Sequence, residues 1–118
     1  MKRCTGILMM LMCVATFAFS APASAHHSFS MFDKSRTLSI NGSLYAVEWQ
    51  NPHSWIWVQA TGPDGVTAVW GFEGGSPAML TRMGYSKKNM LVGTKVTVTY
   101  NPLKDGRTGG SLVTMKFP

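Results

Sequence analysis

The chain has 118 residues, a formal net charge of +6, a hydrophobic fraction of 45% and two cysteines. This length suits one small domain and excludes two domains of ordinary size. The basic excess contains no basic run, so it favours solubility over a nucleic-acid-binding footprint.

The first 25 residues have the pattern of a secretory signal. The basic pair KR at positions 2–3 precedes the 14-residue apolar stretch GILMMLMCVATFAF, and ASA at 23–25 matches a signal peptidase site. The apolar stretch is shorter than the roughly 20 residues of a membrane-spanning helix, although an uncleaved anchor is the alternative. Cleavage would make His26 the N-terminus and remove both cysteines. The sequence therefore predicts a periplasmic or secreted chain of 93 residues, without disulfides or a membrane span.

The first strand is expected over residues 37–49, TLSINGSLYAVEW, where apolar and polar residues alternate. Gly42 indicates a bend or bulge within it. The inward face of this strand is predicted to carry Ile40, Leu44 and Ala46.

The next two strands are expected over residues 53–60, HSWIWVQA, and 66–73, VTAVWGFE, joined by the turn GPDG. In the second strand, Trp55 and Trp57 share one face. Ile56 and Val58 share the other.

A short helix and two further strands complete the chain. Ser76 as N-cap and Pro77 at the first position predict a helix that ends at Gly84. Strands are expected over residues 93–100, GTKVTVTY, and 111–117, SLVTMKF.

Three strands, one short helix and two strands form the element order of a small OB-like five-stranded β-barrel. An open β-sandwich with a flanking helix is the alternative. We expect one domain over residues 26–118 with an N-terminal lead over 26–36. In OB-folds the binding face is bordered by two loops, which would lie here at residues 50–54 and 101–110.

Four motifs of the chain resemble a family of small exported bacterial proteins, family 6152 of the domains of unknown function. They are AHHSF at 25–29, VEWQNPHSWI at 47–56, GTKVTV at 93–98 and KDGRTGG at 104–110. The resemblance implies an exported location and no assigned activity.

The histidines His26, His27 and His53 predict a copper site. An N-terminal histidine can bind a metal through its α-amino nitrogen and ring Nδ1, and His53 would supply a third nitrogen, an arrangement called a histidine brace. Tetragonal nitrogen ligands favour Cu(II). In a variant, His27 binds through its imidazole together with the amine and a deprotonated amide. Further candidates are Met31 as a soft ligand and Glu48 or Glu73 as a ligand or orienting carboxylate.

Each of these features also has a structural interpretation. The paired histidines can be an incidental tail, and His53 after Asn51-Pro52 can cap a turn. Glu48 and Glu73 can be solvated strand ends rather than an acid–base pair. No spacing indicates a nucleophile or a catalytic triad, so we expect a protein that is not an enzyme. A copper oxygenase would be an extension of the same brace.

Trp55, Trp57 and Trp70 can either fill the core or form a binding surface for a peptide or glycan. The need for bulk in a small domain without disulfides favours the core for the first two. Lys104 and Arg107 can contact an anion or be a solvated turn.

The function favoured by these features is an exported barrel that binds copper through His26 and His53. The alternative is a non-catalytic binding module for a peptide, glycan or envelope-protein partner. The predicted partners are a metal ion or small ligand, with an envelope protein as a further possibility, and nucleic acid is expected to be excluded.

Overall fold

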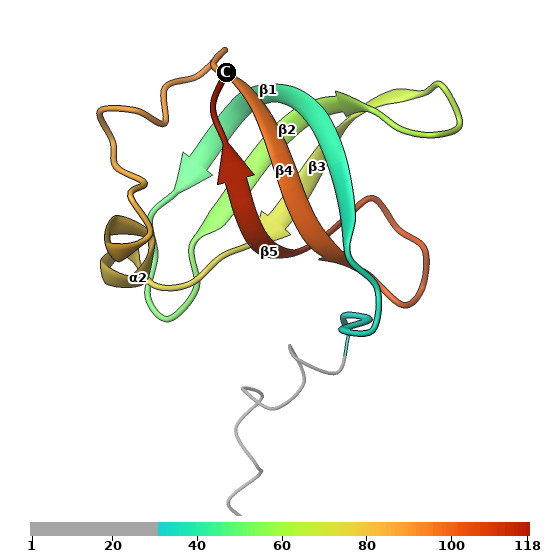
Figure 1. Cartoon of the computed structure of the whole chain (residues 1–118), viewed down its shortest axis with the longest axis horizontal. Helices are drawn as coiled ribbons and strands as arrows, with labels where there is room; N and C mark the ends of the chain where they lie inside the picture. Colours follow the sequence, from blue (N-terminus) through green and yellow to red (C-terminus); the bar gives the residue numbers. More distant parts are fainter. Residues whose placement is uncertain (1–30) are drawn as a thin grey trace, which may run out of the picture.

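Five strands and one short helix follow one another along residues 31–118, the part of the chain that the computed structural model describes (Figure 1). Residues 1–30, which include the predicted signal, His26 and His27, lie outside the described residues. In chain order the elements are β1 (Leu38–Glu48), β2 (Trp55–Thr61), β3 (Thr67–Glu73), α2 (Pro77–Arg82), β4 (Lys95–Pro102) and β5 (Gly109–Lys116).

The strands close into a barrel in the order β1-β2-β3-β5-β4, with β4 paired back to β1. Neighbouring strands are antiparallel except β3 and β5, which pair in parallel and bring Gly71 opposite Gly109. Gly109 has a φ of 120°, and a Cβ there would collide with the Gly71 carbonyl. Glycine therefore permits the close approach that joins these strands. The predicted barrel is confirmed, and the open sandwich is not formed.

All five strands contribute side chains to the barrel interior, and alternate residues of β2 and β3 point into it. Ile56, Val58 and Phe72 are completely buried, as is Leu80 of α2, which packs with them. Burial of a side chain of this size contributes about 1.5–3 kcal/mol relative to exposure. The other buried hydrophobic members of this core are Ile40, Leu44, Ala60, Trp70, Tyr85, Met90, Val96, Val98, Tyr100 and Met115.

The first strand departs from the predicted alternation at one point. The pairing of β1 with β2 shifts register between Leu44 and Ala46, and Tyr45 between them is exposed. Because an extra residue in a strand reverses which side chains face inward, Val47 packs against the core and Ala46 does not. The sequence predicted this irregularity at Gly42, but the structure places it three residues later, at Tyr45.

The helix α2 spans only six residues. It begins as predicted, because the Ser76 side chain accepts a hydrogen bond from the Met79 backbone N–H at 3.2 Å and Pro77 occupies the first turn. Within residues 31–118 no helix is long and apolar enough to cross a membrane.

Candidate functional site

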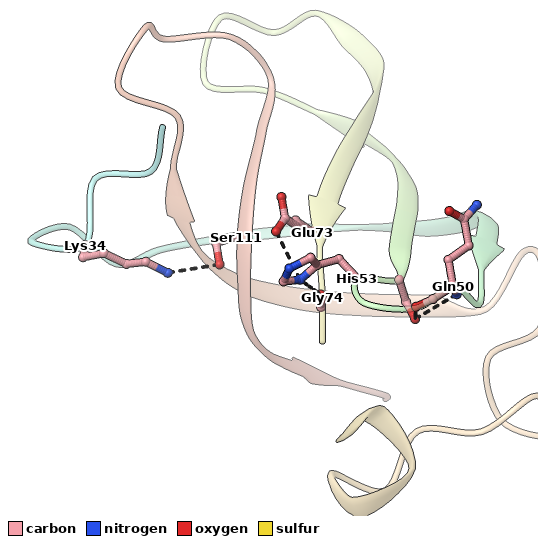
Figure 2. Close-up of polar contacts among 7 residues, drawn as sticks. Lys34, Gln50, His53, Glu73, Gly74 and Ser111 are labelled. Carbon is pink, nitrogen blue, oxygen red and sulfur yellow. Dashed lines mark hydrogen bonds and ion pairs between the residues drawn. The ribbon is translucent and has the colours of Figure 1, made fainter. Parts of the chain in front are cut away.

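The loop between β1 and β2 is fastened to the end of β3 through Ser54. The Ser54 backbone N–H donates to the Gly75 carbonyl at 3.0 Å, and the Ser54 carbonyl accepts from the Gly74 N–H at 2.8 Å. The side chain of Ser54 is fully buried. These bonds place His53 beside Glu73, the last residue of β3 (Figure 2).

The His53 ring has two oxygen neighbours at the same nitrogen. Its Nδ1 lies 3.3 Å from Glu73 Oε1 and 3.3 Å from the Gly74 carbonyl oxygen. Because both oxygens accept hydrogen bonds, they favour a hydrogen on Nδ1, and of the two neutral tautomers this is the one whose lone pair is on Nε2. The Glu73 side chain is only 11% exposed, whereas that of His53 is 35% exposed. The pair therefore fixes one edge of a ring that is still accessible.

A pocket of about 300 Å³ contains both members of this pair. Phe32 from the N-terminal lead and Met79 from α2 also line it. Met79 adds a thioether, a soft donor, to the imidazole and the carboxylate. Sequence reasoning missed Met79 because it is 26 positions from His53, and the two share a pocket only through the way the chain turns into α2 after β3.

The other predicted metal-site residues of the described chain lie elsewhere. Glu48 accepts hydrogen bonds from the Trp57 ring nitrogen at 2.9 Å and from the Gln50 amide at 3.1 Å. Met31 lines a different pocket from the one that holds His53. Residues 31–118 contain no group of three or more histidine, cysteine, aspartate or glutamate side chains that could hold a metal. His26 and His27 lie outside the described residues.

Trp55 and Trp57 lie on the outer face of β2. The core side of this strand is occupied by Ile56 and Val58, and both tryptophans are half-buried. Their rings stack on each other, with centroids 5.6 Å apart and an interplanar angle of 19°. The structure therefore places this pair on the barrel surface and not in the core.

Trp70 has the opposite location. It is 8% exposed, belongs to the core and packs edge-on against Tyr100 at a centroid distance of 6.2 Å. The prediction of Trp70 as part of an aromatic binding surface is wrong, because its position in β3 directs it into the barrel with Phe72.

Lys104 and Arg107 belong to the loop over residues 103–108 that joins β4 to β5. Arg107 Nε binds Asp105 Oδ2 at 2.7 Å. Hydrogen bonds from the Arg107 backbone N–H and from its guanidinium lower the pKa of the Asp105 carboxyl. Arg107 lines the pocket that also contains Trp55 and Trp57, whereas Lys104 does not.

Comparison with known proteins identifies a family and a fold. The model of a family described as a family of unknown function, DUF6152, matches residues 13–112. Among curated proteins, none matches the chain. Among solved structures, the chain is similar to the N-terminal domain of PriB protein from Thermoanaerobacter tencongensis, solved as a dimer. The TM-score is 0.50 at 10% identity, and the match covers 72% of this chain and 98% of that one.

This likeness confirms the OB-like fold and corrects one prediction about partners. The sequence predicted that nucleic acid is excluded as a partner, on the basis of the charge pattern and the expected export. That prediction is wrong. The chain shares its fold with the PriB domain, and OB-folds include oligonucleotide-binding proteins. The lack of a basic run therefore does not exclude this class of ligand.

Proposed function

The chain belongs to the family of unknown function DUF6152, and we propose that it is an exported barrel that binds copper. In this proposal signal cleavage after Ala25 exposes His26, which supplies its α-amino nitrogen and ring nitrogen. His53 supplies a third nitrogen through Nε2. Glu73 holds the His53 ring in position.

The environment of His53 Nδ1 is the observation that carries the proposal. Metal-binding histidines usually donate their second ring N–H to a carboxylate or a backbone carbonyl, which fixes the ring and raises the basicity of the ligating nitrogen. His53 has both acceptors at 3.3 Å, in Glu73 and Gly74. A histidine that only capped its own turn would bond within that turn, whereas the acceptors of His53 lie at and just after the end of β3.

The length of the N-terminal lead is compatible with this site. Phe32 lines the pocket of His53 and follows His26 by six positions. Six extended residues span up to about 20 Å, well beyond the width of a pocket of this size. The lead is therefore long enough for the terminal amine to reach His53.

Copper is the metal that the donor set favours. Nitrogen ligands in a tetragonal arrangement suit Cu(II), which also has the highest affinity among the first-row divalent ions. The α-amine has an ordinary pKa of about 7.7–8.0, so a useful fraction is neutral near pH 7. The Met79 thioether in the same pocket adds a ligand suited to Cu(I).

We propose a binding role rather than catalysis. Its support is that the two glutamates outside the predicted signal engage different partners. Glu48 contacts Trp57 and Gln50, whereas Glu73 contacts His53. The two carboxylates therefore have no contact partner in common, whereas an acid–base pair would act on one shared substrate.

A Cu(II) competition titration tests the proposal. The sample is the exported, processed protein with its His26 terminus verified by intact mass, compared with His53→Ala and with a form carrying one extra alanine before His26. We expect both changes to weaken binding at least about tenfold, or about 1.4 kcal/mol. Equal affinity of wild type and His53→Ala would contradict the proposed site.

A further inference from the structure

A second pocket, of about 290 Å³, lies on the outer face of the barrel over β2 and β3. We call it the tryptophan groove, and its lining includes Phe32, Trp55, Trp57, Gly71, Leu103 and Arg107. Apart from Phe32, this lining is not shared with the pocket of His53.

The tryptophan groove has a preformed aromatic wall. Trp57 is held by its ring nitrogen, which donates to Glu48 at 2.9 Å. Its six-membered ring lies directly over Gly71, where a Cβ would come within 2.5 Å of a ring carbon. Trp55 then stacks on Trp57 at 5.6 Å. A rigid aromatic surface of this kind loses little conformational entropy when a ligand binds.

This wall does not contribute to the barrel interior, which is filled from the other face of β2. Two large aromatic side chains therefore stay partly exposed on a folded surface. Contiguous exposed apolar surface with a polar rim is characteristic of a binding site.

The chemistry of the groove selects a class of ligand. Met31, Phe32, Val69 and Leu103 make much of the lining apolar, and Thr108 and Arg107 are the polar residues besides the two tryptophans. This lining offers few hydrogen-bond partners for the hydroxyl groups of a sugar. It suits a planar apolar ring, which requires few hydrogen bonds.

The rim adds a positive charge from Arg107. Asp105 accepts from Arg107 Nε and neutralises part of this charge, while the two terminal guanidinium nitrogens bind no protein atom within residues 31–118. A guanidinium can bind a carboxylate or a phosphate through these nitrogens. We infer that the tryptophan groove binds a planar aromatic ring that carries an anionic group, with the ring on Trp55 and the anion at Arg107.

Isothermal titration of the processed chain with 2-naphthoate, in EDTA, tests this inference independently of copper. We expect saturable binding that Trp55→Leu weakens about tenfold, in the range of aromatic stacking on a tryptophan. Arg107→Gln should weaken 2-naphthoate about threefold, as for an exposed ion pair, and leave neutral 2-naphthalenemethanol unchanged. Arg82→Gln, which removes a basic residue of α2, serves as the matched control and should bind like wild type.

A parallel titration with 2-naphthyl phosphate identifies the anionic group, and tighter binding of either anion supports the inference. The absence of saturable binding of both anions would overturn it. Unchanged affinity in both Trp55→Leu and Arg107→Gln would also overturn it, as would Trp55-dependent binding of a neutral oligosaccharide without binding of 2-naphthoate. Arg107→Gln keeps the test decisive if Trp55→Leu fails to fold.

Discussion

His53 Nδ1 lies 3.3 Å from Glu73 Oε1, although the two residues are twenty positions apart in the sequence. The contact depends on the backbone bonds of Ser54 to Gly74 and Gly75, which join the β1–β2 loop to the end of β3. A carboxylate is thereby fixed behind an accessible imidazole.

Glu73→Gln is expected to weaken Cu(II) binding. The amide replaces a charged acceptor at His53 Nδ1, and loss of such an orienting partner typically costs about 10–100-fold in metal affinity. Competition titration of the processed protein measures this change. Glu48→Gln is the matched control, because Glu48 contacts Trp57 and Gln50 instead. Equal effects of the two substitutions would remove Glu73 from the site.

Gly71→Ala is expected to destabilise the barrel by about 1–3 kcal/mol, the usual cost of overpacking. Its Cβ would meet the Trp57 ring at 2.5 Å. Urea denaturation followed by circular dichroism measures the change in the free energy of unfolding. Gly74→Ala provides the control, since its nearest neighbour would be the flexible end of Leu80 at 3.4 Å. A larger loss for Gly74→Ala than for Gly71→Ala would contradict the described position of Trp57.

Leu80→Ala is expected to lower the free energy of unfolding by about 2–5 kcal/mol, because it leaves a cavity in the core. Leu80 is the fully buried residue of α2, while Met83 just after it is 41% exposed. Met83→Ala should therefore change stability by less than about 0.5 kcal/mol. Thermal and urea unfolding of both variants would show whether α2 is anchored as described.

Burial raises the pKa of the Tyr100 hydroxyl, against a smaller lowering by the charge of Arg36. A raised pKa means that the folded state holds its proton at pH values where the unfolded chain has lost it. The contribution of the Tyr100 hydroxyl to stability is therefore fully present below the unfolded pKa of about 10. It is lost as the pH rises through the raised pKa of the folded state. Tyr100→Phe should flatten this alkaline loss in urea unfolding curves measured from pH 8 upward. An identical slope in wild type and Tyr100→Phe would contradict the prediction.

The barrel could be predicted because alternation in the strands is local and strong. Val96, Val98 and Tyr100 alternate with polar residues, and all three are buried. Alternation also separates Trp55 and Trp57 from Ile56 and Val58, but it does not say which pair faces inward. The bulk of tryptophan favoured the core, whereas the closed barrel accommodates the smaller side chains inside.

The candidate site was only partly predictable for a different reason. His53 and Glu73 each stood out in the sequence, but their contact depends on the register of β2 with β3, which brings Trp55 opposite Glu73. Met79 joins them only because the chain turns into α2 directly after β3. The β1 bulge between Leu44 and Ala46 likewise arises from pairing with β2 and has no residue signature at that point.

The most direct test of the copper site is the electron paramagnetic resonance spectrum of the processed protein loaded with one equivalent of Cu(II). We expect nitrogen couplings from three ligands in wild type, and from two in His53→Ala. Addition of one alanine before His26 should also change the wild-type spectrum. Identical spectra for wild type and His53→Ala would contradict the assignment of His53 as a ligand.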